Sequence, residues 1–309
     1  MTILVDHLTV IYHPGSPLER VALRNVNLRV EDGSCAAIVG VTGSGKSTLA
    51  QCLNGLLTPT SGRVVVDDIE LTSRGLAGET LRALRRRVGL LFQFPEGQLF
   101  APTIGADVAY GPGQMRLKRA EVEERTRWAL RAVALPDDDA FLARSPFALS
   151  GGQRRRVALA GVLAMRPGIV VLDEPSAGLD AEAREEIYAT LRALRERERL
   201  TLVVISHDMA EVAALAETVL ALRDGQTALA GPTAAVFRQT EAIEAAGLLP
   251  PPLAQVAALA RARGLLRAEP TSFTAEALAE ALRPASSAPQ GRDGAHSATL
   301  DRGDGRHAG

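Results

Sequence analysis

Short apolar runs alternate with longer amphipathic segments along the first 240 residues. The run Cys35–Val39 contains no charged or strongly polar position, which is typical of a central strand buried on both faces. Similar runs predict further strands at 63–66, 88–92, 169–172 and 201–205, and residues 2–12 and 21–30 resemble paired strands. Helical patterns separate the runs at 48–53, 118–133, 151–165 and 181–197. This alternation predicts an α/β fold with a mostly parallel sheet covered by helices.

Two parts of the chain depart from the alternation. The stretch from about 95 to 148 is mainly helical in pattern, so we expect an inserted helical subdomain spanning about 95–165. A proline-rich linker at 248–252 then opens a small helical C-terminal extension at 247–284. The last residues, 285–309, are rich in Gly, Ser, Ala, Arg and Asp and are expected to be disordered.

Composition narrows the class of protein. The 309 residues suffice for about two domains with a full hydrophobic core. A net charge of −1 gives no electrostatic case for nucleic acid or anionic lipid as the main partner. We find neither a signal peptide nor a run of about 18 apolar residues, so we expect a cytoplasmic chain without a direct membrane span. A role at a membrane would require other subunits.

A phosphate-binding loop follows the buried run Cys35–Val39. Residues 40–47 fit the pattern G-x-x-x-x-G-K-[ST], and the strand before and helix after them supply the context that this loop requires. Backbone N–H groups in such a loop wrap phosphates, Lys46 bridges the β- and γ-phosphates, and the Ser47 hydroxyl binds Mg²⁺. The predicted nucleotide-binding residues here are Gly40, Val41, Thr42, Gly43, Ser44, Gly45, Lys46, Ser47 and Thr48.

Polar side chains stand at the ends of other predicted strands. Asp173 and Glu174 end the apolar run 169–172, beside the loop in a parallel sheet. Asp173 is the predicted Mg²⁺ ligand, and Glu174 the group that orients and deprotonates an attacking water. Gln93 follows the strand at 88–92, where it could reach Mg²⁺ or that water. His207 follows 201–205, where it could donate a hydrogen bond to a γ-phosphate oxygen.

A second glycine-rich segment, Leu-Ser-Gly-Gly-Gln at 149–153, opens a predicted helix. This segment is a second potential anion-binding site, about a hundred residues from the phosphate loop. It does not serve the nucleotide bound at that loop, so a second ATPase subunit is required to complete it.

Together these residues resemble an ATP-binding cassette (ABC) ATPase subunit over roughly residues 1–240. The matching set consists of Tyr12, 40–47, Gln93, 149–153, Asp173, Glu174, 176–180 and His207. The resemblance implies a P-loop NTPase fold with an N-terminal antiparallel β subdomain. It also implies that Tyr12 stacks on adenine and that Asp180 couples two ATP sites. The residues that would contact ATP bound to the facing subunit are Ser150, Gly151, Gly152 and Gln153.

A finer resemblance lies in Gln-Phe-Pro-Glu-Gly-Gln-Leu-Phe at 93–100 and in the C-terminal extension. Both are similar to the ATPases of energy-coupling factor (ECF) transporters, although Gly97 stands where that family often has histidine. The resemblance implies a peripheral protein on the cytoplasmic side of the cell membrane, paired with itself or a paralogous ATPase. Its other partners would be a transmembrane T component, docked through Glu96, and an S component that binds a vitamin or a cobalt or nickel ion.

Other classes of ABC ATPase remain as alternatives. A conventional ABC importer or exporter is the first, and a non-transport ABC ATPase the second, although neither a long coiled-coil insert nor a second phosphate loop is present.

Overall fold

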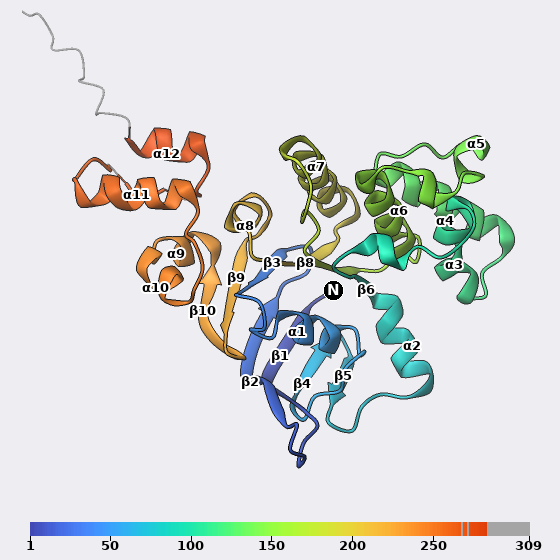
Figure 1. Cartoon of the computed structure of the whole chain (residues 1–309), viewed down its shortest axis with the longest axis horizontal. Coiled ribbons are helices and arrows are strands. Elements are labelled where there is room, and N and C mark those ends of the chain that lie inside the picture. Colours follow the sequence, from blue (N-terminus) through green and yellow to red (C-terminus); the bar gives the residue numbers. More distant parts are fainter. Residues whose placement is uncertain (267, 271, 283–309) are drawn as a thin grey trace, which may run out of the picture.

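The computed structural model describes residues 1–266, 268–270 and 272–282. Two β-sheets lie at its centre (Figure 1). The first sheet is antiparallel with strand order β2-β1-β4-β5. Its strands are β1 (Ile3–Tyr12), β2 (Arg20–Val30), β4 (Ser61–Val66) and β5 (Ile69–Thr72). The predicted pairing of the first two strands is confirmed.

The second sheet has six strands in the order β10-β9-β3-β8-β7-β6. All neighbours pair in parallel except β9 and β10, which form an antiparallel hairpin. The strands are β3 (Cys35–Val39), β6 (Val88–Leu91), β7 (Ile169–Asp173), β8 (Thr201–Ser206), β9 (Thr218–Arg223) and β10 (Gln226–Pro232). The α/β fold with a mostly parallel core sheet and an antiparallel N-terminal sheet is therefore confirmed.

Strand β3 lies at the junction of the hydrophobic cores. All five of its residues have no exposed surface. Ala36 and Ile38 pack into a core shared with the antiparallel sheet and with α1 (Lys46–Leu53). Ala37 and Val39 belong to a core shared with C-terminal helices. Burial on both faces explains the unbroken apolar run, since each side chain of the strand meets another layer.

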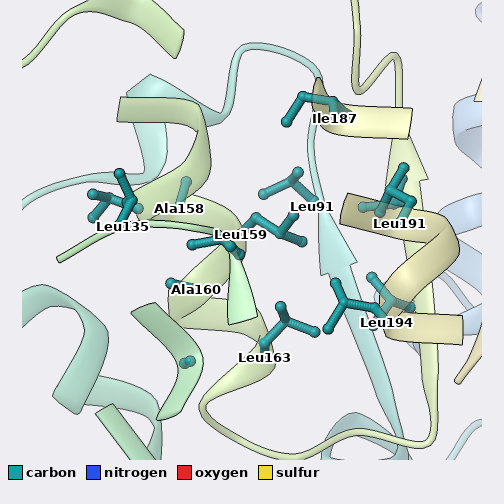
Figure 2. Close-up of a cluster of buried hydrophobic side chains, with 14 of the residues drawn as sticks. Leu91, Leu135, Ala158, Leu159, Ala160, Leu163, Ile187, Leu191 and Leu194 are labelled. Carbon is teal, nitrogen blue, oxygen red and sulfur yellow. The ribbon is translucent and has the colours of Figure 1, made fainter. Parts of the chain in front are cut away.

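The inserted helices lie together on one side of the parallel sheet, at the right of Figure 1. They are α3 (Ile104–Gln114), α4 (Arg119–Ala132), α5 (Asp139–Leu142) and α6 (Gly151–Leu163), with short 3₁₀ turns at Pro95–Gln98 (η1) and Pro146–Ala148 (η2). Leu159 and Leu163 of α6 meet Leu191 and Leu194 of α7 (Ala181–Glu198) in one buried cluster (Figure 2). This cluster fixes α6 relative to the parallel sheet.

The C-terminal helices pack at the other end of the molecule (Figure 1). They are α9 (Thr233–Phe237), α10 (Thr240–Ala245), α11 (Pro252–Ala262) and α12 (Ala275–Leu282). Helix α8 (Met209–Leu215) lies between this group and α7 in the same view, and α2 (Gly78–Arg87) precedes β6 in the chain. Leu248, predicted to lie in a linker, is only 5% exposed and joins the core with Phe237 and Ala257.

The domain boundary at residue 240 stays a prediction, and the predicted tail 285–309 lies outside the described residues. Within the described part of the chain, no helix is both long enough and apolar enough to span a bilayer.

Candidate nucleotide site

The carboxyl ends of three adjacent parallel strands bring the predicted site residues together. Strands β3, β8 and β7 are neighbours in the sheet and run in the same direction. The phosphate loop follows β3, His207 follows β8, and Asp173 ends β7 just before Glu174. Ligands of open α/β sheets bind at this edge. The topology therefore explains how residues more than a hundred positions apart meet.

Near the end of the phosphate loop, the backbone takes a conformation that only glycine can adopt without a clash. Gly45 has φ +105°, and a Cβ atom there would lie 2.6 Å from both Ala22 O and the Leu23 side chain. The loop therefore packs directly against β2. Lys46 donates hydrogen bonds from Nζ to Gly40 O at 2.8 Å and to Val41 O at 3.1 Å. Its ammonium group thus lies across the loop, where phosphate oxygens would replace these carbonyls.

Ser47 and Asp173 meet directly. The Ser47 hydroxyl donates to Asp173 Oδ2 at 2.9 Å. Burial raises the pKa of Asp173, whereas the Ser47 hydrogen bond and the nearby Lys46 charge oppose that rise. Burial likewise lowers the pKa of Lys46, and Glu174 and Asp173 oppose that fall. A hydroxyl beside a carboxylate is a hard-oxygen donor set that suits Mg²⁺ with phosphates and water as further ligands.

The described residues contain no cluster of three or more His, Cys, Asp or Glu side chains suited to a metal.

Glu174 and His207 form the second contact of the site. His207 Nδ1 lies 2.7 Å from Glu174 Oε1. The Glu174 side chain is 9% exposed, whereas that of His207 is 69% exposed and open to a ligand. Glu174 also has φ +54°, and its N–H donates to Ile205 O at 2.9 Å. A non-glycine residue in the left-handed region is strained, and such strain concentrates at functional sites.

A pocket of about 210 Å³ adjoins the phosphate loop. Tyr12 lines it and its hydroxyl lies 3.3 Å from Thr48 Oγ1. The sequence did not single out Arg20, which lines the same pocket. Arg20 pairs with Tyr12 across the first hairpin. The sequence could have identified Arg20, because Tyr12 and Arg20 flank the turn between two strands that were predicted to pair.

The remaining predicted residues lie outside this pocket. Gln93 follows β6 with an exposed side chain, and the structure records no hydrogen bond from it to Ser47 or Asp173. Asp180 caps α7 by accepting a hydrogen bond from Ala183 N at 2.8 Å. The backbone of Glu96 lies in η1, and its side chain is outside the described part of the structure.

The segment 149–153 begins α6. Ser150 is the N-cap, and Ser150 and Gln153 hydrogen-bond to each other's backbone N–H as a capping box. None of these residues lines the pocket beside the phosphate loop. Ser150 and Gly151, at this end of the helix, are exposed.

Arg155, which the sequence also did not single out, connects α6 to the nucleotide site. It is 6% exposed and donates from Nη1 to Pro175 O and Ala177 O, both at 2.8 Å. The helix that begins at Ser150 thereby holds the segment immediately after Glu174. Nothing in the sequence pattern distinguishes Arg155 from the neighbouring Arg154 and Arg156, because its role depends on a contact twenty residues away.

The fold and the site define a P-loop ATPase of the cassette type. The family model described as ABC transporter matches residues 23–177. The energy-coupling factor transporter ATP-binding protein EcfA2 of Clostridium acetobutylicum is 43% identical over 264 residues, covering 85% of this chain and 91% of that protein. The chain belongs to the ABC transporter family, among the energy-coupling factor transporter ATP-binding proteins.

Solved structures agree with this assignment. The structure of cbiO1 from Clostridium perfringens, described as part of the ABC transporter complex cbiONQ, has a TM-score of 0.69 and 32% identity, covering 82% of this chain and 97% of that one. A dimeric ATP-binding cassette in a post-hydrolysis state, bound to ADP and Pi, has a TM-score of 0.66 and 31% identity, covering 75% and 98%. Family membership makes this chain an ATP-binding and ATP-hydrolysing protein.

Proposed function

We propose that this chain is the ATP-hydrolysing subunit of an energy-coupling factor importer, which takes up a vitamin or a transition-metal ion through membrane T and S components. The observation that carries the site assignment is the pairing of Glu174 with His207 at 2.7 Å, beside the contact of Ser47 with Asp173 at 2.9 Å. The similarity to proteins named as energy-coupling factor ATPases supports the transport role.

ATP would bind with adenine on Tyr12 and its phosphates on the loop 40–47. Lys46 then exchanges its bonds to Gly40 O and Val41 O for the β- and γ-phosphates. Mg²⁺, held by Ser47, Gln93 and Asp173, would neutralise negative charge on the phosphates. Arg20 lines the same pocket as Lys46 and would add a second positively charged side chain beside the nucleotide.

Hydrolysis follows from the positions of Glu174 and His207. Glu174 accepts a proton from the attacking water as the water oxygen bonds to the γ-phosphorus and the bond to the bridging oxygen breaks, which gives ADP and phosphate. His207 contacts Glu174 through Nδ1, and its Nε2 can donate to a γ-phosphate oxygen when both ring nitrogens carry a proton. Lys46 and His207 stabilise the charge that develops on the phosphate oxygens.

The active form would be a dimer with a second copy of the chain or a paralogous ATPase. Ser150, Gly151, Gly152 and Gln153 of one subunit would contact the γ-phosphate held by the other. Asp180, which caps α7, lies only six residues after Glu174 and would transmit the state of one site to the other.

The T component would dock in a groove of about 370 Å³ beside η1. Phe92, Phe100 and Tyr110 line this groove and remain 37 to 60% exposed. Exposed aromatic side chains gathered at one concave site are typical of a protein interface. Glu96 belongs to the turn at its edge and would pair with basic residues of the partner. With the T component docked here, the chain would be a peripheral subunit on the cytoplasmic side of the cell membrane.

The first experiment replaces Glu174 with Gln in the full-length chain, tagged at its C-terminus. The E174Q variant should keep ATP binding, lose about 100-fold or more in hydrolysis, and accumulate as the ATP-bound dimer. Purified from membranes in mild detergent with Mg-ATP, it should carry a polytopic T component and a small S component, identified by mass spectrometry. A K46A control, which loses the phosphate contact, should not accumulate the dimer.

Two outcomes would contradict parts of this proposal. Recovery of two conventional permeases, of DNA or of ribosomes would overturn the energy-coupling factor role and leave the ATPase assignment standing. Wild-type hydrolysis by E174Q would overturn the role of Glu174.

A further inference from the structure

The turn that follows α10 contacts the phosphate loop directly. Gly247 has φ +81°, and a Cβ atom built on it would lie 3.1 Å from Val41 Cγ1. Carbon atoms in good van der Waals contact are about 3.5–4.0 Å apart, so a side chain at this position would push Val41 or the turn aside by a few tenths of an ångström. A segment from the C-terminal part of the chain is thus packed against the loop that is predicted to wrap the phosphates.

The turn is a helix end of a defined type. The Gly247 N–H donates to Glu244 O at 2.8 Å, and the Leu248 N–H donates to Ile243 O at 3.1 Å. These two bonds form a Schellman motif with glycine in the left-handed position. Leu248 is 5% exposed and joins the core that contains Val39, the last residue of β3. The end of α10 is therefore anchored to the strand that leads into the phosphate loop.

A second contact ties the same helix end to the parallel sheet. Arg223, the last residue of β9, donates from Nη1 to Ala245 O. The turn after β9 also contacts the phosphate loop, because the Gly225 N–H donates to Ser44 O at 3.2 Å. The β9–β10 turn and the end of α10 are thus joined to each other, and each supports a different residue of the loop.

Val41 is placed to pass a displacement on to the phosphate contacts. Its carbonyl oxygen accepts hydrogen bonds from Lys46 Nζ and from Ser44 N–H, both at 3.1 Å. Its side chain is 39% exposed, so the hydrophobic core does not lock it in place. A neighbour that pushes on this side chain would therefore shift the backbone that orients Lys46 and the loop N–H groups.

We propose that Gly247 is a positioning residue for ATP binding: it lets the end of α10 pack against Val41 and so sets the position of the phosphate loop. The inference rests on the role proposed above for the loop 40–47. It makes the C-terminal helices a support of the nucleotide site, although none of their described residues lines its pocket. ATP affinity and the packing of α10 should then be linked in both directions, because a coupling free energy is reciprocal.

Gly247→Ala tests the contact, and Gly264→Ala is its matched control. Gly264 follows α11 in the same motif, since its N–H donates to Arg261 O at 3.0 Å. The Leu265 N–H donates to Ala260 O at 2.9 Å. The φ of Gly264 is +66°, so alanine meets backbone strain at both positions. A Cβ atom on Gly264 would meet no atom beyond its chain neighbours within 4 Å among the described residues. The two variants therefore differ in the contact with the phosphate loop.

The test measures Kd for a non-hydrolysable ATP analogue with Mg²⁺, and kcat and KM for ATP, on the full-length chain purified with its partners. G247A should raise Kd and KM by about 5-fold or more, because the loop N–H groups lose their alignment with the phosphates. Its kcat should stay within about 3-fold, since Glu174 and His207 follow other strands. G264A should bind and hydrolyse ATP as wild type.

Shortening Val41 distinguishes the contact from strain within the turn. In the Val41→Ala background, Gly247→Ala should change Kd by less than about 2-fold, because its Cβ atom no longer meets Cγ1. An effect of G247A that is equally large in both backgrounds would assign the loss to strain in the turn and overturn the proposal. Wild-type affinity in G247A, or an equal loss of affinity in G264A, would overturn it as well.

If G247A does not fold, hydrogen exchange in the wild-type chain decides, followed by mass spectrometry. Binding of the analogue should slow amide exchange at Gly247 and Leu248, because bound phosphates hold Val41 in place. The amides of Gly264 and Leu265, in the matching turn, should exchange at unchanged rates. Equal protection of the two turns, or no protection at Gly247, contradicts the coupling.

K46A assayed in parallel separates this inference from the proposed function. If K46A loses ATP binding and G247A keeps wild-type affinity, only the role of Gly247 is wrong. If K46A binds ATP as tightly as wild type, the assignment of the phosphate loop is wrong and the inference about Gly247 falls with it.

Discussion

Arg20 is placed in the nucleotide pocket by strand pairing rather than by the phosphate motif. It sits opposite Tyr12 in the register of β1 and β2 and lines the same pocket as Lys46. A guanidinium forms charge-assisted hydrogen bonds to phosphate or ribose oxygens, each contributing about 1.5–3 kcal/mol. At the scale of single residues, Arg20 is therefore the residue outside the sequence prediction that we expect to contribute most to ATP binding.

We expect Arg20→Ala to weaken ATP binding by about 10-fold, which corresponds to the loss of one such bond. The kcat should change little, because Arg20 lies beside Tyr12 and not beside Glu174 and His207. Equilibrium binding of a fluorescent ATP analogue measures the first effect and steady-state kinetics the second. Arg24→Ala, an exposed arginine on the same strand, is the control. Equal affinities for the two variants would exclude Arg20 from binding.

Glu211 of α8 is only 1% exposed and gives a prediction about stability and pH. Burial raises its folded-state pKa above the ordinary value of 4.5. The folded chain then holds a proton that the unfolded chain releases, so the stabilising contribution is complete below pH 4.5 and is lost as the pH rises toward the folded-state pKa. Gln at position 211 does not titrate. The Tm of E211Q relative to wild type should therefore rise as the pH increases above 4.5.

Differential scanning calorimetry across that pH range tests the sign. E241Q, which removes an exposed carboxyl from α10, should show no such trend. A Tm difference for E211Q that is constant or falls with pH would mean that Glu211 is ionised in the folded chain.

At the scale of elements, the apolar content of each segment decided what could be predicted. The runs that became β3, β7 and β8 are almost completely buried, so their patterns were unambiguous. Helix α2 was not predicted because Leu84 is its only buried residue and its last turn is Arg85–Arg87. The β9–β10 hairpin was also not predicted, although Asp-Gly at 224–225 is a strong turn signal.

The same reasoning applies to the site. The predicted residues Lys46, Ser47, Asp173, Glu174 and His207 meet because motif spacing and parallel topology are both readable from sequence. Arg155 was not readable, since its partners lie on another element and no local pattern sets it apart. Long-range contacts that involve single side chains need the structure.

The buried cluster between α6 and α7 gives a prediction for whole elements. Leu191 of α7 is 1% exposed and packs with Leu159 and Leu163 of α6 (Figure 2). Leu191→Ala should lower the free energy of unfolding by about 2–5 kcal/mol, through lost burial and a cavity. Leu249→Ala, at a side chain that is 81% exposed, should change it by less than about 0.5 kcal/mol. Denaturation in urea measures both, and equal effects would contradict the assigned packing.

At the scale of the whole molecule, α6 belongs to two surfaces at once. Its N-terminus carries Ser150, whereas Ala158, Gly161 and Val162 from its later turns line the groove beside η1. Arg155 lies between these two regions and holds the segment after Glu174. A partner in the groove would therefore touch the helix whose N-terminus, in the proposed dimer, would contact the facing subunit's ATP. This arrangement offers a physical connection between the membrane partner and both ATP sites, provided that the groove is where the partner binds.

Phe100→Asp tests that condition. The Phe100 ring is 60% exposed in the groove and packs edge-on against Tyr110, with ring centroids 4.9 Å apart. A carboxylate there removes an aromatic contact and adds a charge to an apolar surface, so recovery of the T component with the tagged chain should fall by about 10-fold or more. ATP affinity should not change, because the nucleotide pocket shares no residue with the groove. Leu249→Asp should retain the partner, because this exposed residue lies between α10 and α11, at the opposite end of the molecule from α3 and α6 (Figure 1). If F100D retains the partner as well, the T component docks elsewhere and α6 does not connect it to the ATP sites.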